Sequence, residues 1–213
     1  MRFRSSANAE DLDGFTGAGL HTSKSGDPND SNYRVLDAVR TVWASVWFFR
    51  AFEERSFRGI DHQSVGMALL VHNSFPDEEA NGVAITANPF DTFGLEPGFY
   101  INVQIGEESV VQPESGVMTD QFIYQFELPG QPIIFIAHSS LVPSGRTVLT
   151  NSQVHTLGIA LKEIHGFFFP LYGGFEWYAM DTEFKFDQPA WDPNGEPVLF
   201  IRQARPYPGL GQP

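Results

Sequence analysis

Short strand-like segments, some of them buried apolar runs and others alternating between apolar and polar residues, make up much of this 213-residue sequence. A period of two residues is typical of half-buried β-strands. The predicted strands are a short one at the start, then 66–75, 82–86, 99–105, 121–126, 133–137, 175–180 and 197–204. Only 33–57 and 152–168 show the three- and four-residue spacing of a helix. The strands outnumber the helices and most lie between them, so we predict an α+β fold with a mostly antiparallel sheet.

The first helical segment, 33–57, is the clearest in the chain. Ser31 or Asn32 is placed to cap its start, because both side chains can accept a hydrogen bond from a free backbone N–H group. Its aromatic pairs, Trp43/Trp47 and Phe48/Phe49, are expected in the helix core rather than on a surface that stacks bases.

Composition excludes several functions. Acidic residues number 26 against 13 basic ones, which gives a net charge of −13 and predicts no nucleic-acid partner, since a phosphate backbone would be repelled. No stretch reaches the roughly 18 apolar residues of a membrane span, and the residues after Met1 lack the apolar region of a signal peptide. Cysteine is absent, which excludes disulfides and thiolate metal sites and is consistent with a cytoplasmic protein.

An acidic protein that binds a polyanion must gather its few arginines in one place, and the start of the chain is the first candidate. Arg4 opens the segment Arg4-Ser5-Ser6-Ala7-Asn8-Ala9-Glu10-Asp11-Leu12, and the glycines of Gly17-Ala18-Gly19 follow. Glycines allow backbone N–H groups to approach an anion, and a guanidinium matches phosphate oxygens. A structural turn beside an arginine would give the same pattern.

The end of the chain is the second candidate. Gln203 and Arg205 are two residues apart in a predicted strand, so their side chains share one face. Glu176 lies between bulky apolar neighbours in the predicted strand before it. A carboxylate and an amide oxygen can hold Mg²⁺, and an arginine can neutralise a phosphate. A surface pair of little energetic value remains the alternative.

Taken in order along residues 2 to 206, these segments resemble the nucleotide-binding domain of the phosphoenolpyruvate synthase and pyruvate, phosphate dikinase family. The resemblance rests on seven ordered motifs: Arg4 to Leu12; Val42-Trp43-Ala44-Ser45 with Arg50-Ala51; Met67 to Val71; Gly82 to Pro89; Ile105 to Val111; Phe175-Glu176-Trp177; and Gln203-Ala204-Arg205-Pro206. The loop Phe15 to Leu20 is also similar to one in glucan, water dikinases.

The resemblance implies an ATP-grasp-like fold that binds ATP and Mg²⁺ between two α+β subdomains. Arg4 would then contact the β- and γ-phosphates, and Gly17, Ala18 and Gly19 would cover them. Val71 and His72, at the end of the strand that begins at Met67, would lie along the adenine. Glu176 and Gln203 would hold Mg²⁺, and Arg205 would act on the transferring phosphate. The predicted domain covers 1–206, and 207–213 is predicted to be a linker.

Three departures from the family pattern shape the functional prediction. The family subdomain that precedes the Arg-Ser-Ser motif is missing, so the N-terminal subdomain is expected to be incomplete. The phosphohistidine segment is missing too, so the partner is expected to be a phosphohistidine-bearing domain or another chain. Gly174 stands where the family often has an acidic residue, two positions before the metal-binding glutamate.

Three functions remain open. The first is an ATP-dependent phosphotransferase component that passes phosphate to a histidine elsewhere. The second is a truncated nucleotide-binding or regulatory module without catalysis. The third, suggested only by the Gly17-Ala18-Gly19-Leu20 loop, is a relative of the glucan dikinases.

Overall fold

The chain forms two compact units, unit 1 (Met1–Ser74) and unit 2 (Phe75–Pro213). The computed structural model describes residues 1–10, 19–74, 78–91, 93–111, 113–172, 177–189, 192 and 194–207. Within these residues, every helix is too short or too polar to cross a lipid bilayer.

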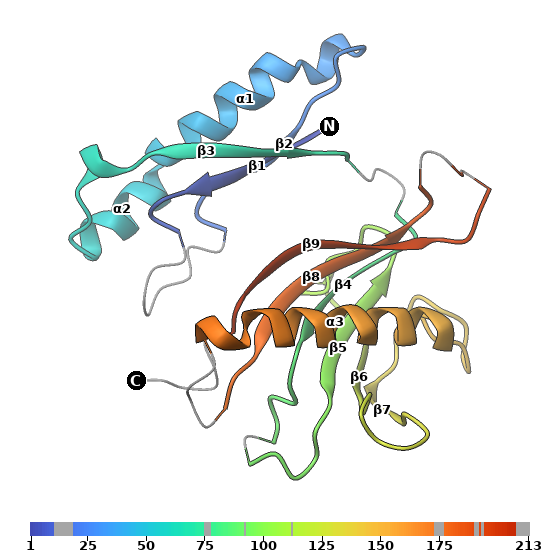
Figure 1. The fold of residues 1–213 in the computed structure, drawn as a ribbon. Helices are drawn as coiled ribbons and strands as arrows, with labels where there is room; N and C mark the ends of the chain where they lie inside the picture. The colour runs from blue at the N-terminus through green and yellow to red at the C-terminus, as the bar shows by residue number, and fades with distance from the viewer. Residues whose placement is uncertain are drawn as a thin grey trace. The chain divides into compact units, whose positions relative to one another are not determined.

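Unit 1 is a small antiparallel sheet with helices (Figure 1). Its strands are β1 (Arg2–Ala7), β2 (Lys24–Ser25) and β3 (Met67–His72), in the order β2-β1-β3. Its helices are α1 (Val35–Ala44) and α2 (Phe49–Phe57), with short 3-10 turns at Ser31–Tyr33, Ser45–Trp47 and His62–Ser64. α1 packs on the sheet because Ala38 and Val42 bury one side of the helix against Phe3 of β1. The short strand predicted at the start of the chain is therefore confirmed.

The prediction of one continuous helix over 33–57 is wrong. Phe48 has an extended backbone conformation and divides the segment into α1 and α2. The Ser45 hydroxyl donates to Val42 O at 2.6 Å, a local bond that competes with helical hydrogen bonding. The buried Arg55 donates to Val46 O at 2.6 Å, so a carbonyl at the break is satisfied. The predicted cap is also wrong: α1 begins after Arg34 without a side-chain cap, and Asp30 caps the preceding 3-10 turn.

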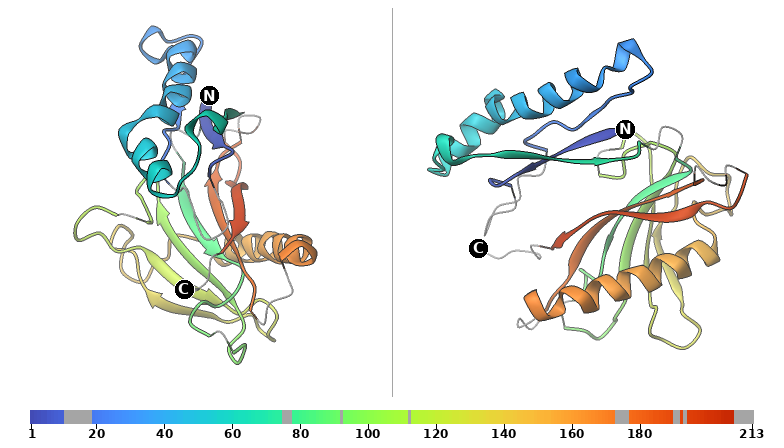
Figure 2. Two further views of the ribbon diagram at one scale, coloured as in Figure 1. Left: turned by 90° about the vertical axis from the view of Figure 1, so that its left-hand side faces the viewer. Right: turned by 45° about the horizontal axis from the view of Figure 1, so that its top comes forward.

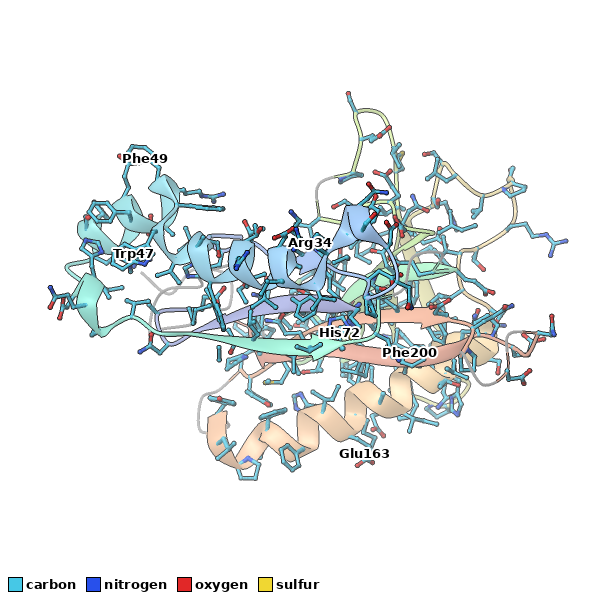
Figure 3. All side chains as sticks on the ribbon, turned by 90° about the horizontal axis from the view of Figure 1, so that it is seen from above. Arg34, Trp47, Phe49, His72, Glu163 and Phe200 are labelled. Atoms are coloured by element: carbon cyan, nitrogen blue, oxygen red, sulfur yellow. The ribbon has the colours of Figure 1, made fainter. Side chains whose placement is uncertain are left out.

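The aromatic residues around this break are on the surface rather than in the core as predicted. Trp43 is 53% exposed, Trp47 58%, Phe48 43% and Phe49 75%. Figure 3 shows Trp47 and Phe49 beside the break between the two helices. The buried residues of α1 are Ala38 and Val42, so Trp43 is left outside its buried side, and the extended residue Phe48 interrupts the helical spacing for the other rings.

Unit 2 is a six-stranded antiparallel sheet with one long helix across it (Figures 1 and 2). The strand order is β7-β6-β5-β4-β8-β9. The strands are β4 (Ala80–Ile85), β5 (Phe99–Ile105), β6 (Asp120–Tyr124), β7 (Ile133–Ala137), β8 (Met180–Asp187) and β9 (Val198–Pro206), and the helix is α3 (Asn151–Tyr172). The predicted α+β class and its mostly antiparallel sheet are confirmed.

The core of unit 2 lies between α3 and one face of the sheet. Leu157 and Leu161 of α3 are fully buried in the same cluster as Ile101, Phe122 and Phe184 of the strands. β8 shows the expected alternation: Met180, Thr182, Phe184 and Phe186 are buried and the residues between them are half-exposed. Asp181 and Glu183 therefore lie on the sheet face opposite α3.

The strand predicted at 175–180 is wrong over 177–179, and residues 175 and 176 lie outside the described part of the chain. Residues 177–179 form no strand, and Met180 is the first residue of β8, which runs on to Asp187. The alternation from Met180 to Asp187 is longer and more regular than that of 175–180, which explains why the strand forms there. The prediction for the last strand, 197–204, matches β9 closely.

Candidate functional site

The pairing of β8 with β9 brings a polar set of side chains together on the sheet face opposite α3. In this antiparallel pair Asp181 lies opposite Arg205, and Glu183 lies opposite Gln203. Residues directly opposite each other in antiparallel strands point to the same face, with Cβ atoms about 5 Å apart. The prediction that Gln203 and Arg205 share a face is thus consistent with β9, and two acidic residues join them.

Arg205 is held by Asp181. Its Nε donates to Asp181 Oδ2 at 2.9 Å, and a terminal guanidinium nitrogen lies 2.9 Å from the same oxygen. Both side chains are about one-fifth exposed, at 23% and 21%. The pair fixes the orientation of the guanidinium fork, which is the geometry needed to present donors to an anionic oxygen.

Glu183 is the residue that sequence reasoning missed. It sits directly opposite Gln203, so a carboxylate and an amide meet across two adjacent strands. Its signal was available in the sequence: Asp181 stands two positions before it, the acidic spacing that Gly174 failed to supply for Glu176. Glu176 itself lies outside the described residues.

A further ion pair lies next along β8. Lys185 shares the face of Glu183 by alternation, and its ammonium contacts the carboxylate of Glu78, whose side chain is only 3% exposed. Burial raises the pKa of Glu78, and this effect exceeds the opposing effect of the Lys185 charge. Among the described residues, no group of three or more His, Cys, Asp or Glu side chains could hold a metal ion.

In unit 1, Arg4 lies on the face of the sheet opposite α1. Phe3 points toward α1, so by alternation Arg2, Arg4 and Ser6 point the other way. The register places His72 of β3 opposite Arg2 and Leu70 opposite Arg4, on that same face. Burial, and then the charge of Arg4, lower the pKa of Arg2. This face therefore gathers two arginines and a histidine in an otherwise acidic chain.

Val71 and His72, the two residues predicted to lie along the adenine, point to opposite faces of β3. Val71 lies opposite Phe3 in the register and so shares the α1 face, whereas His72 shares the face of Arg4. One ligand on the Arg4 face could contact the side chain of His72 but only the backbone of Val71. Gly19 has a φ of 76°, a conformation that favours glycine. Gly17 and Ala18 lie outside the described residues.

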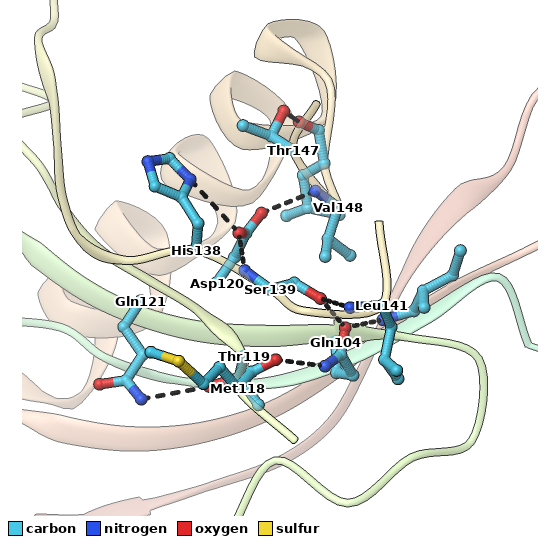
Figure 4. A network of polar contacts seen from close by, with 12 residues as sticks. Gln104, Met118, Thr119, Asp120, Gln121, His138, Ser139, Leu141, Thr147 and Val148 are labelled. Carbon is cyan, nitrogen blue, oxygen red and sulfur yellow. Dashed lines mark hydrogen bonds and ion pairs between the residues drawn. The ribbon is translucent and has the colours of Figure 1, made fainter. Parts of the chain in front are cut away.

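A buried polar cluster between β5, β6 and the loop after β7 is structural (Figure 4). Asp120 is fully buried and accepts 2.7 Å hydrogen bonds from the backbone N–H groups of Ser139 and Val148. His138 Nδ1 lies 3.8 Å from Asp120 Oδ1, which suggests a hydrolase triad at first sight. However, the Ser139 hydroxyl donates to Gln104 Oε1 at 2.6 Å, in the buried interior of the unit. It is therefore bonded to Gln104 and not to His138, so the three residues do not form a triad.

Comparison with known proteins places the chain among nucleotide-binding domains. A family model described as the AMP/ATP-binding domain of pyruvate phosphate dikinase matches residues 1–212. Phosphoenolpyruvate synthase of Pyrococcus furiosus is 33% identical over 123 residues, which are 57% of this chain and 14% of that protein. Phosphoenolpyruvate synthase of Aeropyrum pernix is 34% identical over 86 residues, 40% of this chain and 10% of that protein. The chain therefore matches only a small part of the length of these relatives.

Proposed function

Because the chain belongs to the pyruvate phosphate dikinase AMP/ATP-binding domain family, we propose that it binds Mg-ATP as the nucleotide-binding part of a dikinase-type kinase. The observation that carries the proposal is the β8–β9 register, which aligns Asp181 with Arg205 and Glu183 with Gln203 on one polar face. An ATP-grasp-like arrangement is part of this proposal, and the antiparallel sheet of unit 2 is compatible with it.

Arg205 supplies the cationic group of the proposed site in unit 2. Asp181 holds the guanidinium in one orientation, so little side-chain freedom is lost when a phosphate binds. Phosphoryl transfer requires positioning and charge neutralisation more than a reactive side chain. In unit 1, Arg4 is the proposed second phosphate contact, with Gly17, Ala18 and Gly19 as the covering loop and Val71 and His72 as the adenine strand.

Mg²⁺ fits the donors that face each other across β8 and β9. Mg²⁺ prefers oxygen ligands and is commonly held by one or two carboxylates together with nucleotide phosphates. Glu183 offers a carboxylate and Gln203 an amide oxygen from directly opposite positions. When bound, the ion would offset the charge of the phosphate oxygens. We therefore propose Glu183 with Gln203 as the protein ligands, and Glu176, the ligand that the family resemblance implies, is the alternative carboxylate.

The acceptor of the phosphate is proposed to be a histidine on another domain or chain. The support is membership of a dikinase family, together with relatives named phosphoenolpyruvate synthase whose length extends far beyond the matched segment. Incubation with labelled ATP, with and without a separate histidine-bearing domain of such a relative, measures this step independently of ATP binding. Label that never reaches the added domain would leave the nucleotide-binding module without catalysis as the function.

Replacing Arg205 with alanine is expected to weaken ATP binding by at least about tenfold, a loss of about 1.4 kcal/mol, because a charge-assisted contact to phosphate is removed. Titration calorimetry with ATP and Mg²⁺ measures the affinity of each variant for ATP. Arg146→Ala is the matched control, since Arg146 is an exposed arginine of the same unit in the segment between β7 and α3, outside the β8–β9 pair. Equal affinity of the Arg205 and Arg146 variants, or no ATP binding by the unaltered chain, would contradict the proposal.

Glu183→Gln is expected to remove most of the Mg²⁺ dependence of ATP binding, because a neutral amide replaces the only carboxylate assigned to the ion. Glu176→Gln is expected to leave that dependence unchanged. The measurement is ATP affinity with Mg²⁺ and with EDTA for the two variants. The opposite ranking would return the metal to Glu176 and refute the assignment made from the strand register.

A further inference from the structure

Unit 2 contains a cavity of about 550 Å³ beneath the C-terminal half of α3, on the face of the sheet away from Asp181 and Glu183. This volume lies within the range of small-molecule sites. Aromatic side chains provide much of its wall: Phe99, Phe126, Phe169, Trp177 and Tyr178. Thr86, at the end of β4, belongs to the same lining and accepts a 2.8 Å hydrogen bond from Met180 N.

The charged side chains of this lining already have partners in the protein: Asp91 accepts hydrogen bonds from the backbone N–H groups of Phe93 and Glu96. Lys162 is paired with Glu127 at 2.9 Å at the edge of the cavity. His165 Nδ1 lies 2.9 Å from the Thr86 hydroxyl, and burial lowers the pKa of the imidazole, so this side chain is neutral near pH 7. A charged ligand would have to break the Lys162–Glu127 pair or lose its own hydration without a new partner.

We propose that this cavity binds a neutral, flat aromatic molecule of one or two fused rings. Rings stack or meet edge to face with aromatic walls, and such contacts add to the benefit of apolar burial. His165, which packs against Tyr178 with ring centroids 4.7 Å apart, supplies a polar group for orientation. The site is separate from the nucleotide face, because Met180 and Asp181 of β8 point to opposite sides of the sheet.

Gly166 gives direct experimental access to the cavity. It belongs to the lining, and a Cβ atom added there would meet no other atom within 4 Å. Because Gly166 is exposed and an added Cβ is free of clashes, a larger side chain can be introduced at this edge of the cavity. Gly166→Leu is the blocking variant. Thr156→Leu is its matched control, because Thr156 is an exposed residue of the same helix outside the cavity lining.

The test is a titration of the ¹⁵N-labelled chain with indole, followed through the amide of Gly98 and the side-chain N–H of Trp177. Indole is expected to bind with a Kd on the order of 1 mM, as suits a fragment of this size. Gly166→Leu should weaken binding at least about tenfold and Thr156→Leu should not. Tryptamine and indole-3-acetate, which carry opposite charges on the same ring system, should bind at least about fivefold more weakly.

Three results would overturn the inference. The first is no saturable shift with indole up to about 10 mM, a limit well above the expected Kd. The second is equal indole binding by the Gly166→Leu variant while its ATP affinity is unchanged, since the cavity would then be excluded as the site. The third is equal binding of the charged analogues, which would refute the ligand class. ATP affinity is measured separately, so failure here leaves the proposed function untouched.

Discussion

Replacing Asp120 with alanine is expected to lower the free energy of unfolding by about 3 kcal/mol, because a fully buried carboxylate that accepts two backbone N–H bonds is removed. Both N–H groups, of Ser139 and Val148, would then lack an acceptor in the interior. The loss would concentrate in the loop 139–148, which these bonds tie to β6. Urea denaturation measures the stability, and hydrogen exchange of the loop shows its release.

Two further variants make this prediction specific. Asp120→Asn keeps one acceptor oxygen and is expected to lose less than the alanine variant. Glu127→Ala removes an acidic residue from an exposed ion pair with Lys162, and is expected to change stability by less than about 1 kcal/mol. The prediction fails if the Asp120→Ala protein is as stable as the Glu127→Ala protein and hydrogen exchange in the loop is unchanged. The buried network would then not be what holds the loop in place.

Gly158→Ala is expected to destabilise the chain by about 1–2 kcal/mol, although alanine favours helices. A Cβ atom at this buried position of α3 would lie 2.5 Å from Tyr124 Cε1 and 2.7 Å from Phe126 Cδ2. Tyr124 is 2% exposed and has no room to withdraw. Overpacking typically costs 1–3 kcal/mol, and two contacts below 3.0 Å place this site in the upper part of that range, about 2–3 kcal/mol, which exceeds the gain of about 1 kcal/mol in helix propensity. Thermal and urea unfolding give the sign and the size.

Gly166→Ala, two turns later in the same helix, is the matched comparison. Nothing lies within 4 Å of the added Cβ, so only the helix propensity remains and stability should rise by about 0.5–1 kcal/mol. The two substitutions are chemically identical and have opposite expected signs. The same sign for both would mean that the packing of Tyr124 and Phe126 does not limit α3.

The sequence predicts much of this fold because strands such as β8 bury every second residue against α3. β5 and β7 begin and end at their predicted residues, and the class follows from the balance of strands and helices. The break at Phe48 could not be predicted from spacing. It depends on Ser45 and Arg55 satisfying carbonyls with side-chain bonds, and the position of Arg55 is set by tertiary packing.

The candidate site divides in the same way. Gln203 and Arg205 share a face because side chains in a strand alternate with a period of two residues. Local sequence is therefore enough to predict this part of the site. Which acidic residues meet them depends on the pairing of β8 with β9, a register that local sequence does not state. The expectation for Glu176 came from motif order, whereas the alignment of Asp181 with Arg205 and of Glu183 with Gln203 emerges only when the strands are paired. The opposite orientations of Val71 and His72 follow from the same strand period, whereas pairing with β1 decides which of the two shares the face of Arg4.

The β8–β9 ladder is irregular at one point: Glu183 pairs with Gln203, but the next residue, Phe184, pairs with Ile201, which leaves Arg202 as an extra residue in β9. This has a consequence for comparing distant relatives. A sequence shorter by one residue at this point would keep both polar pairs intact, so an alignment gap opposite Arg202 is compatible with a working site. A gap between Gln203 and Arg205 would instead turn one of the two side chains to the other face. Where a gap falls in the last strand thus distinguishes relatives that can have kept the site from those that cannot.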